Sequence, residues 1–112
     1  IISCCYEAHN YFGPGLLEKV YQEAACCELN ERFIDFQKEL KIPAFYKDQN
    51  LGFNYQADII VEDKVLLELK AVKELNEVHF AQCLNYLKLT GLKVCLLINF
   101  GEDKVRIKRF VL

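Results

Sequence analysis

Three ionisable side chains, Asp58, Glu68 and Lys70, lie at the ends of two short apolar segments and are of the types that could hold a divalent cation. The apolar runs 59–61 and 65–67 flank three charged residues, a pattern typical of two strands in a tight hairpin. Glu68 and Lys70 are two residues apart and therefore share a strand face. Charges at the ends of strands that are apolar on both faces are costly to desolvate unless they are paired or bind a cation. This cost indicates that the three side chains form a functional site.

The hairpin geometry brings the two carboxylates together. With a three-residue loop, Val61 lies opposite Val65, and Asp58 lies opposite Glu68 with Cβ atoms about 5 Å apart. A two-residue loop would shift the register by one and place Asp58 opposite Leu69, on the wrong side. We therefore predict a three-residue loop, or a bulge that restores the same parity.

Two carboxylates at this distance repel each other, and a divalent cation relieves the repulsion. Magnesium favours such oxygen ligands and keeps several waters. The alternative interpretation is that the carboxylates and Lys70 form only ordinary ion pairs. The spacing alone leaves both interpretations open.

The composition is that of one globular domain, which we predict to cover residues 1–112. The hydrophobic content of 53% and the charged content of 27% are those of a folded chain rather than a disordered one. The net charge is -2, so binding to nucleic acid would need a local basic patch. No apolar run reaches the roughly 18 residues of a membrane span. Because the sequence begins at Ile1 rather than Met, we expect a short preceding piece, and a removed targeting segment stays open.

The six cysteines are expected to be small buried apolar residues in a reducing cytoplasm. They form no CxxC or Cys/His zinc spacing. The adjacent pairs 4–5 and 26–27 cannot easily form local bridges, while Cys83 lies in a predicted helix and Cys95 in a predicted buried strand. A disulfide framework is the less favoured alternative.

Two helices are predicted at the start of the chain. The first covers residues 1–11 and includes His9, for which we expect an ordinary helix position rather than a ligand role. Gly and Pro at 13–15 break it. The second covers residues 16–32 and carries a broad apolar arc formed by Leu16, Leu17, Val20, Tyr21, Ala24, Ala25 and Leu29.

Glu18 falls inside this apolar arc, where a carboxylate is costly without a partner or a function. Tyr21 lies one helical turn away and could donate a hydrogen bond to Glu18. The alternative is that Glu18 lies at the edge of the arc and reaches water.

The remaining elements predict an α/β (α+β) sandwich with helices on a mixed sheet. Pro43 indicates an edge strand or a strand start. A helix over 77–90 ends at Gly91. The predicted strands cover residues 34–40, 42–46, 53–61, 65–71, 94–100 and 104–109, with a turn at 48–52.

Two polar patterns on these elements have open interpretations. In the 77–90 helix, one stripe is polar and is flanked by apolar residues: His79, Gln82, Cys83, Tyr86 and Thr90. This stripe faces either an ionic cleft or ordinary core contacts. In the last strand, the cations at 104, 106 and 108 share one face, which favours protection of a sheet edge over phosphate contact.

The sequence resembles a known family. The segment Gly15–Tyr21 (GLLEKVY) is similar to the signature of the GxxExxY proteins. The similarity continues through Tyr55–Asp58, Glu68–Val72, His79, Ala81–Gln82, Leu84–Leu87 and Leu97–Gly101, and so covers essentially the whole chain. These proteins are grouped with the PD-(D/E)XK nuclease superfamily, whose core is α-β-β-β-α-β around a central mixed sheet. The resemblance implies this fold.

The resemblance also assigns motif positions. Asp58 and Glu68–Lys70 match the D…ExK motif, although the aspartate follows Tyr-Gln-Ala rather than proline. Glu18 matches the carboxylate of the first core helix. Gln82 and Tyr86 are similar to the QxxxY helix motif of the RecB-like branch.

The activity implied is phosphodiester hydrolysis with magnesium or manganese. The resemblance assigns the metal to Asp58 and Glu68, joined by the Leu69 backbone carbonyl and by Glu18. Such a metal lowers the pKa of a bound water and polarises the phosphoryl oxygen.

The remaining implied roles concern water and substrate. Lys70 would orient the attacking water and offset charge in the transition state. Gln82, Tyr86 and His79 would line the substrate side, with Tyr21 as a further substrate-side residue. For His79, a positioning role is preferred to that of general base.

Three function classes follow. The first is a metal-dependent nuclease that binds DNA or RNA weakly alone and works as a homodimer or with a protein partner. The second is a non-catalytic binding or assembly module on a nuclease-like scaffold. The third is a phosphoesterase acting on small phosphate compounds. We expect no membrane association for any of them.

Overall fold

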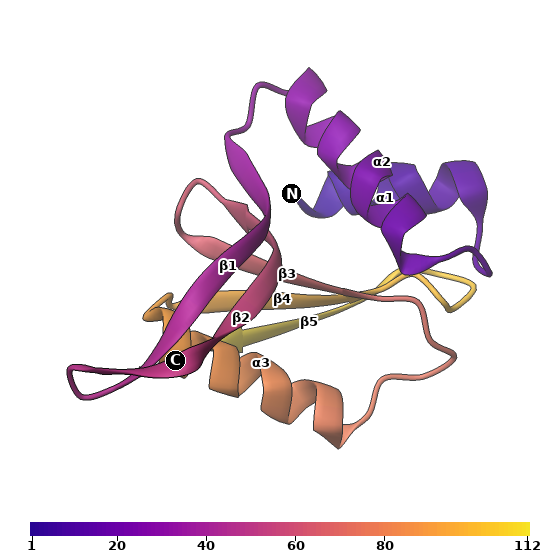
Figure 1. The fold of residues 1–112 in the computed structure, drawn as a ribbon. Helices are drawn as coiled ribbons and strands as arrows, with labels where there is room; N and C mark the ends of the chain where they lie inside the picture. The colour runs from indigo at the N-terminus through magenta and orange to yellow at the C-terminus, as the bar shows by residue number, and fades with distance from the viewer.

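Five strands form one mixed sheet with helices on both faces (Figure 1). The computed structural model describes residues 1–112. Its elements are α1 (Ile2–Phe12), α2 (Glu18–Glu31), β1 (Phe36–Tyr46), β2 (Gln49–Val61), β3 (Val65–Lys70), α3 (Glu77–Thr90), β4 (Val94–Asn99) and β5 (Arg106–Val111). The strand order is β1-β2-β3-β4-β5, with β3 and β4 parallel and the other neighbours antiparallel. The predicted mixed sheet is confirmed, and α1 and β5 extend the α-β-β-β-α-β core.

The helices divide the sheet into an α1–α2 face and an α3 face. A core of 15 buried residues includes Leu29, Leu67 and Ile98 and lies beneath α1 and α2. A smaller core of 8 buried residues includes Leu66 and Leu87 and lies beneath α3. Since β3 and β4 are buried on both faces, their sequences are apolar runs without alternation.

The long hairpin of β1 and β2 changes face at Asp58. Ala57 packs in the core beneath α3, but Ile59 packs in the core beneath α1 and α2, although residues two apart on a regular strand share a face. On β1, Lys38 pairs with Ile59 and the next pair joins residues 40 and 57, so Glu39 and Asp58 lie between the two pairs. Glu39 has a left-handed backbone with φ 53°. This irregularity sets Asp58 apart from both cores.

Two strands predicted at 34–40 and 42–46 are one continuous strand, β1, and that prediction was wrong. Pro43 is tolerated because β1 is an edge strand, and the register shifts between Pro43 and Phe45. Proline has no N–H to donate, and on an edge strand its nitrogen can face away from the neighbouring strand, where no ladder hydrogen bond is needed.

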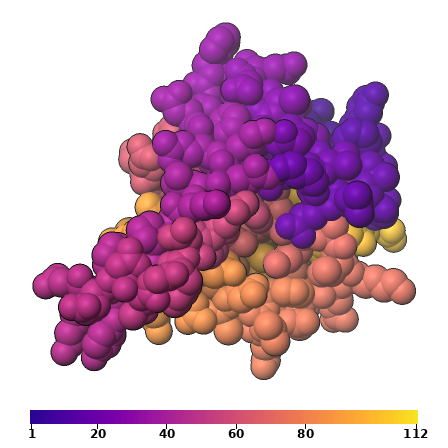
Figure 2. All heavy atoms as spheres, viewed as in Figure 1, coloured from indigo at the N-terminus to yellow at the C-terminus, as the bar shows by residue number.

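The predicted turn at 48–52 was also misplaced. The chain turns at Lys47, which has φ 54°, and β2 already begins at Gln49. The Asn50 side chain accepts a hydrogen bond from the Gly52 N–H at 2.8 Å. This local hydrogen bond is typical of turns but lies within β2. The tip of the hairpin extends away from the body of the molecule (Figure 2).

The second helix begins at Glu18 rather than at residue 16. Leu16 and Leu17 precede it and are exposed, Leu17 by 77%. In the rest of the predicted arc, Tyr21, Ala25 and Leu29 are buried, whereas Val20 and Ala24 are half-buried. The helix predicted at 77–90 has the predicted bounds, and its Gly91 cap is left-handed.

Five of the six cysteines are buried, and all six are free thiols. Cys27, on α2, is the exposed one. None of the helices is long and apolar enough to cross a membrane.

Candidate functional site

The β2–β3 hairpin has the predicted three-residue loop. Val61 pairs with Val65, and the Lys64 N–H donates to the Val61 carbonyl at 3.0 Å. The ladder, however, ends at the pair of Ile59 and Leu67. The predicted ladder pair of residues 58 and 68 is therefore not formed, because the hairpin changes face at this point.

Asp58 is held by a backbone donor of β3. Its Oδ2 atom accepts the Leu69 N–H at 2.8 Å. Because the ladder has ended, this side chain accepts the hydrogen bond in place of a β2 carbonyl. Burial raises the pKa of Asp58, while the Leu69 hydrogen bond and the Lys70 charge lower it. The carboxyl group thus has a fixed direction between Glu68 and Lys70 of β3.

Glu68 is a buried carboxyl group on the α3 face, with 6% of the residue exposed. The Tyr55 hydroxyl donates a hydrogen bond to its Oε1 atom. Burial and then the Asp58 charge raise the pKa of Glu68 to about 8, against the lowering effect of the Tyr55 hydrogen bond. At neutral pH, Glu68 is therefore mostly protonated unless a cation compensates its charge.

Lys70 lies half-buried at the end of β3. Its charge lowers the pKa of Glu18, Asp58 and Glu68, so the ammonium group acts on all three carboxyl groups. It forms no ion pair with any of them. Lys70 is therefore available to an anionic ligand.

Glu18 is the first residue of α2, and its carboxyl group is on the Asp58 side of the site. The residue as a whole is exposed, but its carboxyl group is partly desolvated, and this desolvation followed by the Asp58 charge raises its pKa. No three His, Cys, Asp or Glu side chains are gathered closely enough to hold a metal ion. The predicted metal ligands Asp58, Glu68 and Glu18 thus lie in one region. The Glu18 carboxyl group, however, is not close enough to the other two to form a three-carboxylate metal site.

On α3, Tyr86 and Gln82 are on the side of the carboxyl groups. The Tyr86 ring stacks on Tyr55 with centroids 3.7 Å apart. Burial and then the Glu68 and Asp58 charges raise the pKa of Tyr86. Gln82 lies one turn earlier on the same helix side, is half-buried and has no hydrogen-bond partner within the protein. The polar stripe predicted on this helix therefore includes residues beside the site.

His79 is used differently, as a capping residue of α3. Its Nδ1 atom accepts the Asn76 N–H at 3.1 Å, while the Asn76 side chain accepts the N–H groups of Val78 and His79. This reciprocal arrangement satisfies the free donors of the first helical turn. The Nδ1 atom is consequently not free to act as a base.

Tyr21 is not at the surface of the site. The residue is fully buried and stacks on Phe100 with centroids 4.7 Å apart. Its hydroxyl donates to the Gly13 carbonyl and accepts the Leu16 N–H at 3.2 Å. The predicted hydrogen bond to Glu18 is not formed, and the substrate role predicted for Tyr21 is wrong, because its hydroxyl instead fixes the loop before α2.

Two residues of the site had no role in the sequence prediction. Tyr55 orients Glu68, and the one signal for it was its place in the segment that ends at Asp58. Glu39 lies across the hairpin from Asp58, and its carboxylate accepts hydrogen bonds from Lys19 and Gln22 of α2. Nothing local in the sequence indicates Glu39, because its position results from the change of face in the hairpin.

Comparison with known proteins defines the class of this molecule. A family model described as the PD-(D/E)XK nuclease superfamily matches residues 1–110. The chain therefore belongs to the PD-(D/E)XK nuclease superfamily, whose members generally use divalent metals. The narrower resemblance to the GxxExxY proteins stays a prediction.

Among solved structures, the chain is similar to an alkaline exonuclease (LHK-Exo) from Laribacter hongkongensis, with 14% identity and a TM-score of 0.48. The similarity covers 83% of this chain and 55% of that protein, so the chain spans little more than half of its length. No curated protein sequence matches this chain significantly.

The donor set suits a hard divalent cation. Asp58 and Glu68 each have one oxygen in a hydrogen bond with the protein, and the second oxygen of each has no partner within it. Mg²⁺ is commonly bound by one or two carboxylates together with waters and substrate phosphates. The pair of Asp58 and Glu68, with the Glu18 carboxyl group in the same region, fits this pattern.

Proposed function

We propose that this protein is a magnesium- or manganese-dependent nuclease that hydrolyses phosphodiester bonds of nucleic acid. The observation that carries the proposal is the convergence of Asp58, Glu68 and Lys70 around the Leu69 backbone. Burial and then the Asp58 charge raise the pKa of Glu68 to about 8, and a carboxyl pair of this kind beside an unpaired lysine is arranged to gain from a cation and an anion together.

In this proposal, Asp58 and Glu68 hold the metal, with the Leu69 carbonyl and Glu18 as further ligands. The ion, when bound, supplies a more acidic water and polarises the phosphoryl oxygen. Asp58 is oriented by the Leu69 N–H, and Glu68 by the Tyr55 hydroxyl, so one oxygen of each is directed by the protein. Glu68 releases its proton when the cation compensates its charge.

Lys70 acts on the substrate side. Its ammonium group stabilises the charge that develops on the phosphoryl group and orients the attacking water. Gln82 and Tyr86 contact the substrate beside it. His79 contributes by fixing the start of α3.

Nucleic acid is the substrate class that the superfamily supports. With a net charge of -2, the chain binds it weakly alone, and we propose that a second copy or a partner protein strengthens binding. The free thiols support a reducing, cytoplasmic location.

A cleavage assay tests this function. Fluorescently labelled single- and double-stranded DNA and RNA are incubated with Mg²⁺, Mn²⁺ or a chelator. We expect metal-dependent cleavage that falls at least about 100-fold in Lys70→Ala, because a charge at the transition state is lost. Lys73→Ala, which removes an exposed lysine nearby, is the matched control and should retain activity.

Calorimetry with Mn²⁺ distinguishes a failure of the assigned site from a failure of the nuclease function. Cleavage that survives in Lys70→Ala contradicts the assigned site. Absence of both cleavage and Mn²⁺ binding contradicts the nuclease function and favours the non-catalytic module. Cleavage of mononucleotide phosphates without cleavage of polymers favours the phosphoesterase.

A further inference from the structure

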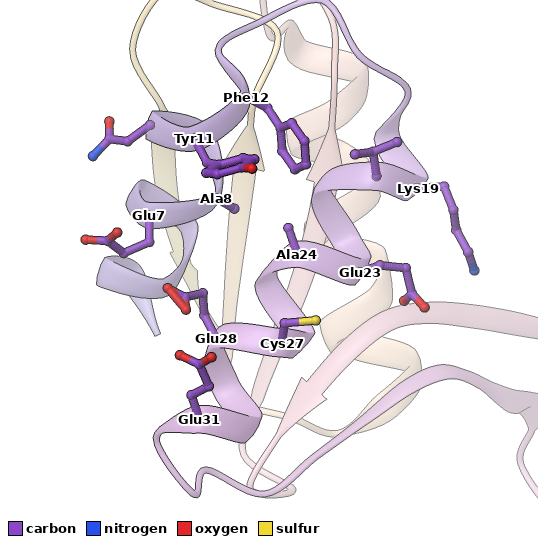
Figure 3. Close-up of a pocket in the computed structure, with 12 residues that line it drawn as sticks. Glu7, Ala8, Tyr11, Phe12, Lys19, Glu23, Ala24, Cys27, Glu28 and Glu31 are labelled. Carbon is purple, nitrogen blue, oxygen red and sulfur yellow. The ribbon is translucent and has the colours of Figure 1, made fainter.

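A groove runs between the two N-terminal helices, on the side away from the sheet. This α1–α2 groove is lined by five residues between positions 7 and 12 of α1 and seven residues between positions 19 and 31 of α2, and has a volume of about 970 Å³. Figure 3 shows its lining side chains in front of the helices, with the strands behind. It is separate from the carboxyl site at the end of β3.

The floor of the groove is apolar and made of small side chains. Val20, Ala24 and Cys27 follow one another at helical spacing on α2, and Ala8 faces them from α1. Small side chains allow another helix to approach closely. A floor of this shape accepts the apolar stripe of an amphipathic helix.

One end of the groove is aromatic. Tyr11 is 84% exposed, and Phe12 is also exposed. Their rings meet edge to face with centroids 4.9 Å apart. Exposed aromatic side chains beside an apolar floor are typical of protein contact surfaces.

The rim of the groove is acidic. Glu7, Glu23, Glu28 and Glu31 line it, and the one cation among the lining residues is Lys19, which is already paired with a carboxylate outside the groove. Glu28 and Glu31 lie at the C-terminal end of α2, whose last turn contains no basic residue. Negative charge at a helix C-terminus is unfavourable, so a cation supplied there is stabilising.

Two further observations at the rim also bear on its need for a cation. The Glu23 Oε1 atom pairs with Lys38, but its Oε2 atom is buried without any hydrogen-bond partner. At the other end, the guanidinium of Arg32, the C-cap residue of α2, donates its hydrogen bond to the Cys4 sulfur, and its charge acts on Glu28 and Glu7 without forming an ion pair with either. The rim thus contains one buried acceptor, the Glu23 Oε2 atom, that the chain does not itself satisfy.

We propose that the α1–α2 groove binds an amphipathic helix of a partner protein, with an apolar stripe on the floor and Lys or Arg side chains along its margins. The apolar floor accounts for the stripe, and the rim carboxylates account for the cations. Nucleic acid and anionic membranes are unsuitable occupants, because their phosphates meet four glutamates. The surface is therefore distinct in chemistry from one that binds a polyanionic substrate.

A designed peptide tests the proposal on the full chain. The probe is a fluorescein-labelled helix of 14 residues, the length of α2, with leucines along one stripe and lysines elsewhere. A scrambled peptide of the same composition is the control for charge attraction. Fluorescence anisotropy measures affinity. Alkylation of Cys27, the one exposed cysteine, reports whether the peptide covers the floor.

We expect saturable binding of one peptide per chain with protection of Cys27, and clearly weaker binding of the scrambled peptide. The double variant Glu28→Lys and Glu31→Lys should weaken binding about tenfold, as two lost surface ion pairs predict. The matched control, Glu74→Lys and Glu77→Lys, changes the net charge equally at exposed positions outside the groove and should leave affinity unchanged. Cys27→Asp should abolish binding by placing a charge on the floor.

Several results would overturn the proposal. One is equal affinity for the scrambled peptide, or equal weakening by both double variants, since either shows attraction by net charge alone. Another is the absence of binding or of Cys27 protection. Self-association that protects Cys27 without peptide, measured by sedimentation, would show that a second copy occupies the groove instead.

Discussion

The two faces of the sheet differ in what they bury. The α1–α2 face holds the larger core, with 15 buried apolar residues. The α3 face holds a core of only 8, and beside it lie the hydroxyl of Tyr55, the carboxyl group of Glu68 and the ring of Tyr86. The α1–α2 face therefore mainly stabilises the fold, whereas the α3 face also holds ionisable groups of the site.

This difference shows how a small chain accommodates a buried carboxyl group. Burying a carboxyl group is unfavourable, and the cost appears as the raised pKa of Glu68. The apolar core on the opposite face compensates for it. Substitutions on the α1–α2 face should therefore change stability, whereas those at the site should change chemistry.

The largest effect is expected from Asp58→Asn. The amide oxygen can still accept the Leu69 N–H, so the fold is retained, while the charge that supports a metal is lost. We expect cleavage and Mn²⁺ binding to fall at least about 100-fold, with little change in thermal unfolding. Asp58→Ala is the comparison: it leaves Leu69 without an acceptor and should also cost about 1–2 kcal/mol of stability.

The second prediction tests the opposite face. Leu29→Ala removes a fully buried side chain from the α1–α2 core and should lower the free energy of unfolding by about 3 kcal/mol. Urea denaturation measures this change. Leu89→Ala, on the exposed side of α3, should cost far less. A specific loss of metal binding in the remaining folded Leu29→Ala protein would contradict the separation of roles.

The third prediction concerns pH. The pKa of Glu68 is raised from 4.5 to about 8, so the folded state favours its protonated form. The stability it contributes is full below pH 4.5 and is lost as the pH rises through 8. Glu68→Gln should remove this loss and be more stable than the parent above pH 8 by up to about 5 kcal/mol, at about 1.4 kcal/mol per pKa unit. Unfolding measured between pH 4 and 9 checks it, and parallel curves for the two proteins would contradict it.

The smallest effect is expected from Tyr55→Phe. The lost hydroxyl no longer lowers the pKa of Glu68, so that pKa should rise further. Mn²⁺ affinity at pH 7 should then fall about tenfold, as for the loss of a group that orients a metal ligand. Tyr46→Phe, on the exposed hairpin, is the control. Unchanged affinity in both variants would show that Tyr55 only packs against Tyr86.

Local patterns predicted much of this arrangement. The three-residue loop followed from two apolar runs, and the helix at 77–90 followed from its periodicity and its glycine stop. Continuous β1 was missed because Pro43 is compatible either with an edge strand or with the start of a new strand, and the sheet order decides for the edge. Tyr21 was misassigned because its hydroxyl partners lie in a loop whose path the sequence does not specify.

By itself, the sequence determined which two carboxylates and which lysine lie on the paired strands, because strand periodicity and loop length are local properties. Only the tertiary structure decided how they meet. The change of face at Glu39 and Asp58, the Leu69 hydrogen bond and the burial of Glu68 beneath Tyr55 depend on packing between distant segments. Hydrogen-bond partners and desolvation are set by such long-range contacts, and they determine the ionisation of this site.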